Sequence, residues 1–589
     1  MSDVEVSRTE SLTRHEAARR LAALATALAD GGRVEVDLGA SKLTLHVPDQ
    51  VRCEVEVEVD GDEVELELEL KWSTATAPLL GRTRAAPQPS PPGTEEEQPM
   101  TQTTANRRRS PRPAAAPASP SREQRVARGR AARAASPRAG HAEFTRVPGR
   151  ADPIALLQRQ AAARVPELLP IRYGRMAVSA FTYFRGAALP MASDLADTPR
   201  TGLVAQTCGD AHMANFGLFA SPERRLVFDI NDFDETLPGP WEWDVKRLAA
   251  SLEIAGRDNG YAERTRREIV VSSVAAYRMA MRAFADRPTL EVWYAVAEMD
   301  ELQKRLASKL GGGRRKALAR NIAKAHTKDN LGALDRFAGV HEGRPRIVAD
   351  PPLITPVRDL VGDEAYQTEV EQGLRDVLSS YRSSLGPERR ALLDQYRLVD
   401  VARKVVGVGS VGTRAYMMLL LGDDLRDPLF LQAKEAGPSV LEEFVGESRY
   451  DNGGERVVVG QRLMQTVSDI FLGWVRVQGF DGRTRDFYLR QLRDWKGSAE
   501  IGTMVPKGMR IYGELCGWTL ARAHARSGDR IAIAAYLGDG PAFDRAVGAF
   551  AAAYADQNES DHQALLSAIA AGRITAESVD PGPTSRSKG

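Results

Sequence analysis

Residues 1 to 73 carry two regular hydrophobic patterns, one after the other. In the first, apolar residues recur at helical spacing before Gly31-Gly32: Ala17, Leu21, Leu24 and Leu28. In the second, apolar and acidic residues alternate strictly over 54–59 and 64–70, on either side of Asp60-Gly61-Asp62. The first pattern predicts an amphipathic helix, and the second predicts a β-hairpin with one apolar and one acidic face. We therefore expect a small α+β domain over residues 1–73.

The periodic pattern is lost over residues 74–148, where Pro, Ala, Ser and Arg dominate. Such a composition cannot bury enough apolar surface to fold, so the pattern predicts a disordered linker. A basic run begins at Arg107 and continues to Arg138. It offers weak contacts to nucleic acid, but it lacks the interleaved aromatic residues on which bases stack. We expect no specific nucleic-acid binding from this segment.

Regular patterns return at residue 149 and continue to about residue 575. Helical spacing dominates 149–400 and 499–575, whereas 401–498 has the short apolar runs and glycine turns of β-strands. These patterns predict an α+β fold with a helical lobe, a β-rich lobe and a final group of helices that completes the helical lobe. The last residues, 576–589, are polar and read as a disordered tail.

Composition narrows the class of protein. Of the 589 residues, 43% are hydrophobic, and the net charge is +1, so the chain as a whole is no polyanion binder. The three cysteines are far apart in sequence and give no disulfide framework. No apolar run is long enough to cross a membrane, and the first residues do not resemble a signal peptide. These features predict a cytoplasmic protein without membrane contact.

Candidate chemistry is concentrated in residues 204–250. Asp210 is followed five positions later by Asn215, and a strand pattern over 225–230 ends in Asn231-Asp232-Phe233-Asp234-Glu235. Oxygen donors of this kind, on loops beside apolar strands, suit Mg²⁺ that is shared with phosphate. The spacing fits phosphoryl transfer, in which an Asp orients the acceptor hydroxyl while an Asn and a later Asp bind metal. Asn215 and Asp232 are the expected metal ligands, and Asp229 remains an alternative to Asp232.

A second group of candidate residues lies in the β-rich segment. Gly407, Gly409, Ser410 and Gly412 form a turn between two strand patterns. A dinucleotide fold would need a helix after these glycines, so the pattern favours a glycine-rich hairpin over nucleotide phosphates. The next strand ends at Lys434, a position suited to a phosphate contact. We expect this lysine to pair with Glu442 or Glu443 at the start of a helix.

These pieces resemble the aminoglycoside-phosphotransferase branch of the kinase-like superfamily. The shared layout is Gly-Asp-x-His-x-x-Asn, a strand, an Asp-aromatic-acidic motif, and then an Asp, here Asp244, at a helix start. Cys208 stands where that branch usually has His. The order along the chain is rotated, because the Asp/Asn loop precedes the glycine hairpin and the lysine strand. The pieces therefore predict a two-lobed kinase-like fold that is circularly permuted.

Two further resemblances cover most of the chain. Motifs such as CGDAHMANFG and PGPWEWDVKRLAAS make residues 150–572 similar to the bacterial family called domain of unknown function 2252. Residues 1–73 resemble the bacterial amphi-Trp domain. Neither resemblance implies an activity.

The expected function is an ATP- and Mg²⁺-dependent phosphotransferase that acts on an unknown small-molecule or protein acceptor, with nucleotidyl transfer as a variant. Asp210 and Lys434 are the expected catalytic residues, and the glycine hairpin with Lys434 and Glu442 is expected to bind the nucleotide. Arg185 is a candidate for a phosphate contact, with an ordinary ion pair as its alternative role. Two other functions remain open: a catalytically inactive scaffold and a metal-dependent phosphoesterase.

Overall fold

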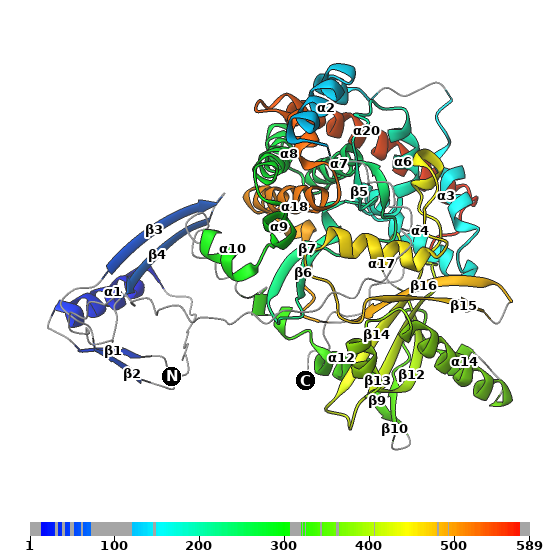
Figure 1. The fold of residues 1–589 in the computed structure, drawn as a ribbon. Helices are drawn as coiled ribbons and strands as arrows, with labels where there is room; N and C mark the ends of the chain where they lie inside the picture. Colours follow the sequence, from blue (N-terminus) through cyan, green and yellow to red (C-terminus); the bar gives the residue numbers. More distant parts are fainter. Residues whose placement is uncertain are drawn as a thin grey trace, which may run out of the picture. The chain divides into compact units, whose positions relative to one another are not determined.

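The computed structural model of the chain forms two compact units, 1–117 with 308–316, and the remainder. The structure describes residues 13–29, 33–37, 42–46, 52–60, 63–71, 120–144, 149–306, 320, 322–323, 325–341, 344–360, 364–405, 407–479, 482–492 and 494–577. Each unit is described by itself below. Figure 1 shows the elements of both.

The first unit contains the helix and the hairpin that the sequence predicts. Helix α1 spans Arg14–Ala29, and strands β3 (Arg52–Asp60) and β4 (Glu63–Lys71) are antiparallel, with Val55 opposite Leu68. The helix and hairpin predictions are therefore confirmed. A second pair that the sequence analysis did not predict, β1 (Arg33–Asp37) and β2 (Lys42–His46), lies between them in the chain.

The second unit begins with a helix in the segment for which a linker was predicted. Helix α2 (Arg122–Ala135) starts at a capping box formed by Ser121 and Gln124, and a short 3₁₀ helix, η1 (Arg138–Ala142), follows it. The Arg133 Nε donates to the carbonyl oxygen of Tyr536 at 2.8 Å. The prediction of a disordered linker is thus wrong for 120–144, because these arginines bind carbonyl oxygens at the end of helix α19 rather than solvent. The predicted linker residues 74–119 lie outside the described part of the chain.

Five helices form the core of the helical part, and they come from two distant stretches of sequence. They are α7 (Trp241–Asp258), α8 (Glu263–Ala285), α18 (Pro506–Ser527), α19 (Arg530–Leu537) and α20 (Ala542–Ala570). Nearly every side chain of α7 is buried, because its neighbours cover it on several sides. The last helices, α18 to α20, pack against α7 and α8 (Figure 1).

Short helices and strands between η1 and α7 carry the loops of the candidate site. The helices are η2 (Pro166–Leu168), η3 (Met213–Asn215), α3 (Pro153–Ala161), α4 (Leu169–Ala177), α5 (Ala180–Gly186) and α6 (Ala188–Ala196). Strand β5 (Val204–Thr207) pairs with β8 (Leu237–Pro240), and β6 (Phe216–Ala220) pairs with β7 (Leu226–Ile230), both antiparallel. Helices α9 (Thr289–Tyr294) and α10 (Met299–Leu306) follow α8.

A six-stranded antiparallel sheet forms the β-rich part, in the order β11-β12-β13-β14-β16-β15. Its strands are β11 (Ile354–Pro356), β12 (Arg397–Lys404), β13 (Ala415–Leu421), β14 (Pro428–Glu435), β15 (Gly473–Gln478) and β16 (Thr484–Gln491). Alternate residues of β14 enter different cores: Leu429 and Leu431 pack on the side of α14 (Glu364–Arg382), and Phe430 packs with Phe337 of α12 (Asn330–Phe337). The predicted strand, glycine turn and strand, followed by the lysine strand, are confirmed.

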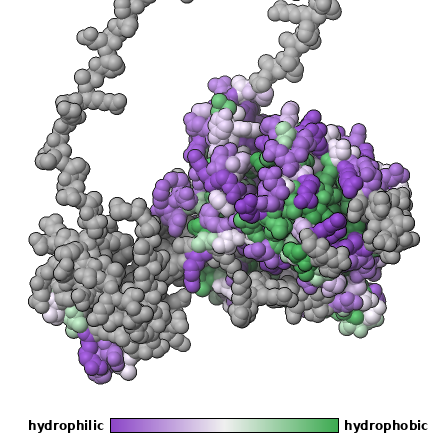
Figure 2. Space-filling view, turned by 90° about the horizontal axis from the view of Figure 1, so that it is seen from below, coloured by the Kyte–Doolittle hydropathy of each residue, from purple (hydrophilic) through white to green (hydrophobic). Residues whose placement is uncertain are grey.

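Smaller elements border this sheet. They are the hairpin β9 (Ala338–His341) and β10 (Arg344–Ile347), α13 (Val357–Leu360), α15 (Pro387–Leu393) and η4 (Ile501–Thr503). Figure 2 shows the second unit from the side of the sheet, where hydrophobic residues gather in one area bordered by hydrophilic residues.

The segment between β14 and β15 differs from the prediction. The helix expected from residue 439 onward is a single turn, α16 (Glu442–Val445), and the longer helix is α17 (Gly453–Met464). In the predicted β-rich segment 401–498, the next strand after β14 begins only at Gly473. Glycines and three consecutive valines give α17 weak helix propensity, so tertiary packing rather than local preference decides its structure.

The α+β class is therefore confirmed. No helix in the described residues is long and apolar enough to span a bilayer.

Candidate active site

The loop that carries Asp210 is fixed to the helical core through its backbone. Asp244, at the start of α7, accepts hydrogen bonds from the amides of Cys208 at 2.6 Å and Gly209 at 3.0 Å. Gly209 has φ of +80°, and a Cβ there would lie 2.4 Å from the carbonyl oxygen of Glu235. Only glycine fits both requirements, and the fit brings the Asp210 loop directly against the acidic loop 231–235.

Asp244 is itself held by the two core helices beside it. The Nε2 of His524 lies 3.1 Å from its Oδ2, and the Nδ1 of His524 lies 2.9 Å from the hydroxyl of Tyr277. All three side chains are buried. The position of Asp210 thus depends on a polar chain that runs through α7, α18 and α8.

The side chain of Asp210 is partly exposed and is oriented by Arg247. The Arg247 Nε donates to Asp210 Oδ1 at 2.5 Å, and its Nη2 donates to the carbonyl oxygen of Phe184 at 3.0 Å. Asn215 donates to the carbonyl oxygen of Asp210 at 2.7 Å, while its own carbonyl accepts from the amide of Asn231. Asn215 therefore joins the Asp210 loop to the acidic loop, as expected for two parts of one site.

His212 does not take part in this polar surface. Its side chain is buried, and burial lowers its pKa to about 3 despite the nearby charge of Asp210. The imidazole is therefore neutral near pH 7 and packs inside the loop.

Lys434 reaches the acidic loop from β14. Its Nζ lies 2.7 Å from Asp234 Oδ2 and 3.4 Å from both carboxylate oxygens of Asp232. The Tyr488 hydroxyl donates to the other oxygen of Asp234 at 2.6 Å. Only 3% of the Lys434 side chain is exposed, so the lysine points into the protein and toward the carboxylates. The sequence analysis required this meeting of two segments 202 residues apart, and the contact confirms it.

Charge pairing sets the protonation of this group. Burial acts to raise the pKa of Asp234, but the charge of Lys434 and hydrogen bonds from Lys434 and Tyr488 outweigh it and lower the pKa to about 2. Burial, together with the charge of Asp234, raises the pKa of Asp232. Burial would lower the pKa of Lys434, yet the two aspartates raise it above its usual value. Lys434 and Asp234 are therefore both charged near pH 7.

The two alternatives for a metal carboxylate occupy different places. Asp229 is buried in β7 and bonded to Arg522 and to the amide of Ile230, so its charge is already compensated inside the core. Asp232 lines a cavity. Its assignment as a metal ligand is thus the one that the geometry favours, and the assignment of Asp229 loses its support.

The donor set at the cavity suits a cation shared with a ligand rather than a closed metal cage. Asp232 lines the cavity, and Asp234 shares Lys434 with it. The carboxamide of Asn215 lies on the adjoining loop, where its Nδ2 donates to the carbonyl oxygen of Asp210. In the described part of the chain, no three His, Cys, Asp or Glu side chains are placed to hold a metal ion. Mg²⁺ fits such an open set, because it commonly keeps waters and substrate phosphates among its ligands.

The predicted partner of Lys434 is corrected by the structure. Glu442 accepts from the amide of Ser439 at 2.9 Å, and Glu443 pairs with Arg159, while Lys434 pairs with Asp234 and Asp232. The expected ion pair between Lys434 and Glu442 is therefore wrong. The short turn at residue 442 caps its own backbone instead of pointing its carboxylates toward β14.

Helix α17 contributes an arginine to the acidic loop. Arg456 is buried and donates to the carbonyl oxygens of Thr236 at 2.7 Å, Asp234 at 2.8 Å and Gly437 at 2.9 Å. These bonds fix the backbone between the carboxylate of Asp234 and the strand β8. Arg456 thereby shapes the loop that holds Lys434.

The glycine turn between β12 and β13, which we call the glycine loop (residues 405–414), packs against the first helices of the second unit. The Arg175 Nη1 donates to the carbonyl oxygen of Gly407, and the amide of Val165 donates to that of Gly412. Gly407 and Gly412 have φ of +66° and +89°, which explains their glycines. Ser410 donates to Asp234 Oδ2 at 3.3 Å, so this loop also reaches the acidic loop.

A cavity of about 310 Å³ lies at this junction. Asp232, Gly407 and Ser410 contribute to its lining. Five basic residues line it as well, Lys328, Lys404, Lys434, Arg490 and Lys496, of which Lys496 has its pKa lowered by burial to about 7. This excess of positive charge around one enclosed space suits a polyanion such as a triphosphate.

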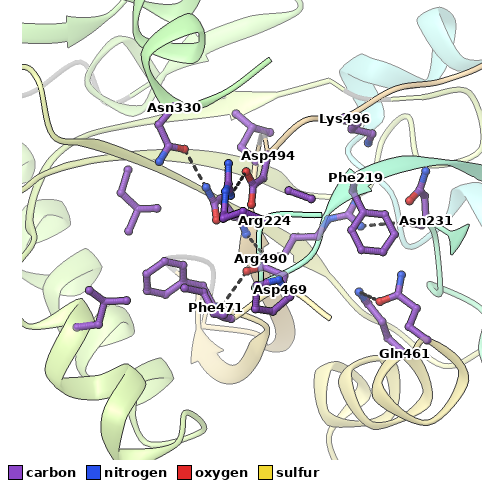
Figure 3. Close-up of a pocket in the computed structure, with 18 of the residues that line it drawn as sticks. Phe219, Arg224, Asn231, Asn330, Gln461, Asp469, Phe471, Arg490, Asp494 and Lys496 are labelled. Carbon is purple, nitrogen blue, oxygen red and sulfur yellow. Dashed lines mark hydrogen bonds and ion pairs between the residues drawn. The ribbon is translucent and has the colours of Figure 1, made fainter. Parts of the chain in front are cut away.

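A second cavity, of about 290 Å³, adjoins the first and shares Arg490, Leu492 and Lys496 with it. Figure 3 shows Phe219 and Phe471 with the amides of Asn231, Asn330 and Gln461 around this space, and Arg490 near its centre. The Arg490 Nη1 donates to the carbonyl oxygen of Asn231 at 2.8 Å. Aromatic faces together with amide groups suit a planar heterocycle with hydrogen-bonding edges.

Sequence analysis missed several residues of the site. Tyr488 and Arg490 could have been found, because residues two apart in a strand point to the same face of the sheet. In the structure they stand opposite Lys434 and Gln432. Asp234 could have been found as the second aspartate of the acidic loop. Arg456 gave no such signal, because its helix was not predicted. Arg247 looked like an ordinary helix residue.

Two family models match the chain. Residues 164–568 match the model described as an uncharacterized protein conserved in bacteria (DUF2252), and residues 1–78 match the Amphi-Trp domain. No curated protein and no solved structure shows a significant match to the chain.

Proposed function

Because the chain belongs to the bacterial DUF2252 family, whose description names no activity, we propose a function from the site itself: the second unit transfers a phosphoryl group from Mg²⁺-bound ATP to a hydroxyl acceptor. The observation that carries the proposal is the contact of Lys434 with Asp232 and Asp234 at the wall of a strongly cationic cavity. A buried lysine beside carboxylates and an anion-sized space is the arrangement that positions a nucleotide triphosphate.

The chain's own residues have separate roles in this reaction. Lys434 binds phosphate oxygens, and the glycine loop lets backbone amides approach them. Asp210 orients the acceptor hydroxyl and takes its proton, and Arg247 keeps its carboxylate in place. Asp232, with Asn215 and Asp234, would hold Mg²⁺, which when bound neutralises phosphate charge. The adjoining cavity of Figure 3 offers aromatic and amide groups to the base.

The order of elements supports a kinase-like architecture in permuted form. The chain forms, in this order, a glycine hairpin (β12 and β13), a lysine strand (β14), a helix (α17) and two further strands (β15 and β16). All five strands belong to one antiparallel sheet. The Asp210 loop and the acidic loop, which would follow these strands in an unpermuted kinase, precede them here. A permutation preserves the contacts of a site when only the chain connections change.

Nucleotidyl transfer is a second candidate, favoured by the number of cations in one cavity. Lys328 and Lys404 add to Lys434 and Arg490, and together these side chains supply positive charge for a leaving pyrophosphate. The products distinguish the two reactions. Phosphoryl transfer yields ADP and a phosphorylated acceptor, whereas nucleotidyl transfer yields pyrophosphate and leaves AMP, joined through its α-phosphate, on the acceptor.

Titration calorimetry of ATP, with and without Mg²⁺, tests the proposal. We expect binding that requires Mg²⁺ in the unmodified protein and a loss of at least about 10-fold in affinity in Lys434→Met and Asp232→Asn, since each removes a charge-assisted contact. Lys507→Met, at an exposed lysine on α18, is the matched control and should bind as the unmodified protein does. Circular dichroism checks that each variant is folded. Equal ATP binding by all four proteins would refute the proposal.

A further inference from the structure

Arg185 lies between the two halves of the site. It belongs to helix α5 and directly follows Phe184. Arg247 donates hydrogen bonds both to the carbonyl oxygen of Phe184 and to Asp210, so it connects this part of α5 to the Asp210 loop. On its other side, the carbonyl oxygen of Arg185 would be 2.9 Å from a Cβ at Gly409 in the glycine loop. The residue thus borders both the carboxylate that would orient the acceptor and the loop that would cover the phosphates.

The guanidinium of Arg185 is held but not used within the protein. Its Nε is buried and has no hydrogen-bond partner in the described part of the chain. Burial lowers the pKa of Arg185, and the charge of Asp210 opposes this shift from a distance, while Arg247 is the arginine that pairs with Asp210. A buried donor without a partner costs about 1–3 kcal/mol, and a ligand that accepts a hydrogen bond from it would remove this cost.

Neighbouring arginines differ from Arg185 because each of them donates a hydrogen bond from its guanidinium, although the Nε of Arg164 is also buried without a partner in the described part of the chain. Arg175 donates to the carbonyl oxygen of Gly407, and Arg164 donates to that of Val411, both at 2.6 Å. Their role is to hold the backbone of the glycine loop. Arg185 is near enough to Asp210 for the charge of that carboxylate to affect its pKa, and its Nε has no partner in the described part of the chain.

We propose that Arg185 is a further catalytic residue, which binds the phosphoryl group while it passes from nucleotide to acceptor. This inference rests on the proposed function. In the transfer, the acceptor oxygen bonds to the γ-phosphorus as the bond from that phosphorus to the β–γ bridging oxygen breaks. ADP leaves with the electron pair, and the hydroxyl proton passes to Asp210. Arg185 stays protonated and donates to the equatorial oxygens, which carry the charge of the transition state.

Binding of a transition-state analogue tests this role without knowledge of the acceptor. The probes are MgADP alone and MgADP with aluminium fluoride, whose fluoride complex imitates the transferring group. We expect Arg185→Met, which keeps an unbranched side chain as far as the position of Nε, to bind MgADP within about twofold of the unmodified protein. It should bind the aluminium fluoride complex about 10- to 100-fold more weakly, because one charge-assisted contact is lost. Arg185→Lys should recover part of this loss.

Arg159→Met is the matched control, since Arg159 is exposed and pairs with Glu443 away from the cavity. It should change neither affinity. An equal loss for MgADP and for the aluminium fluoride complex in Arg185→Met would overturn the inference, as would no loss for either. If the unmodified protein binds neither probe, the proposed function fails, and the inference falls with it.

Discussion

Lys434 and Asp234 each determine the charge of the other. The lysine keeps the pKa of Asp234 near 2, and the two aspartates keep the lysine protonated in a place where burial alone would neutralise it. Such pairs are costly to break on one side, because the remaining charge stays buried without compensation. The same pair that would bind phosphate therefore also contributes to folding.

This dependence predicts an asymmetry between single and double variants. Lys434→Met should lower the free energy of unfolding at pH 7 by about 2–4 kcal/mol, because Asp232 and Asp234 are then left as neighbouring anions. Without Lys434, burial raises the pKa of Asp234, so lowering the pH from 7 to 5 should restore part of the loss. Adding Asp234→Asn should restore most of it at pH 7. Urea unfolding at both pH values measures these differences, and additive losses in the double variant would contradict the prediction.

A second dependence of stability on pH comes from His141, whose pKa is lowered in the folded protein. Its side chain is fully buried against Tyr536, and burial, with the charge of Lys246, lowers its pKa to about 3. The unfolded chain binds a proton at this residue below about pH 6.5, but the folded protein does not. Stability is therefore complete above pH 6.5 and falls as the pH decreases toward 3, by up to about 1.4 kcal/mol per pH unit.

Replacement of His141 tests this effect. His141→Gln keeps a polar contact to Tyr536 but does not titrate, so the loss of stability between pH 7 and pH 5 should be smaller than in the unmodified protein. Guanidinium unfolding curves at the two pH values give the comparison. An unchanged pH dependence would show that His141 contributes nothing to it.

At the scale of elements, α2 is held by a close approach to α19. Gly129 of α2 is buried, and a Cβ there would be 2.1 Å from the carbonyl oxygen of Ala532. Alanine normally stabilises a helix relative to glycine, so any destabilisation must come from this contact.

We expect Gly129→Ala to displace α2 and to expose its arginines to trypsin. Gly373→Ala in α14 is the matched control, because the added methyl group meets nothing within 4 Å, and it should be neutral or slightly stabilising. Limited proteolysis followed by mass spectrometry identifies the cleavage sites. Equal resistance of both variants would show that the contact with α19 is not what holds α2.

The sequence predicted those elements whose local pattern agrees with their final environment. The apolar runs of β13 and β14, the glycine turn and the apolar repeat of α8 are of this kind. The sequence did not predict α17, because its valines and glycines favour other structures until the sheet packs against it. It misjudged 120–144, because arginines that bind helix-end carbonyls have the same composition as arginines in solvent.

For the whole second unit, one cavity is lined by residues from both parts of the fold. Asp232 comes from the helical part, and Lys404, Lys434 and Arg490 come from the sheet. A ligand that contacts both parts stabilises their joint arrangement by mass action.

Under the proposed function, MgATP at about 100 times its dissociation constant should stabilise the unit by about 2.7 kcal/mol and raise its melting temperature. The Lys434→Met variant should show a much smaller rise, and Lys507→Met should respond as the unmodified protein does. Differential scanning fluorimetry over a series of MgATP concentrations measures the shift. Equal shifts in all three proteins would place the ligand elsewhere.

The long-range assembly of the helical core has a consequence for biosynthesis. Helix α20 packs on α7, α8 and η1, yet it is translated about 300 residues after α7 begins, since Trp241 and Ala542 are the first residues of the two helices. Ribosomes add roughly 5–20 residues per second, so the nascent α7 waits many seconds with its apolar surface uncovered. Chaperones that shield emerging chains should therefore matter more for this protein than for one whose neighbouring helices are also neighbours along the messenger RNA.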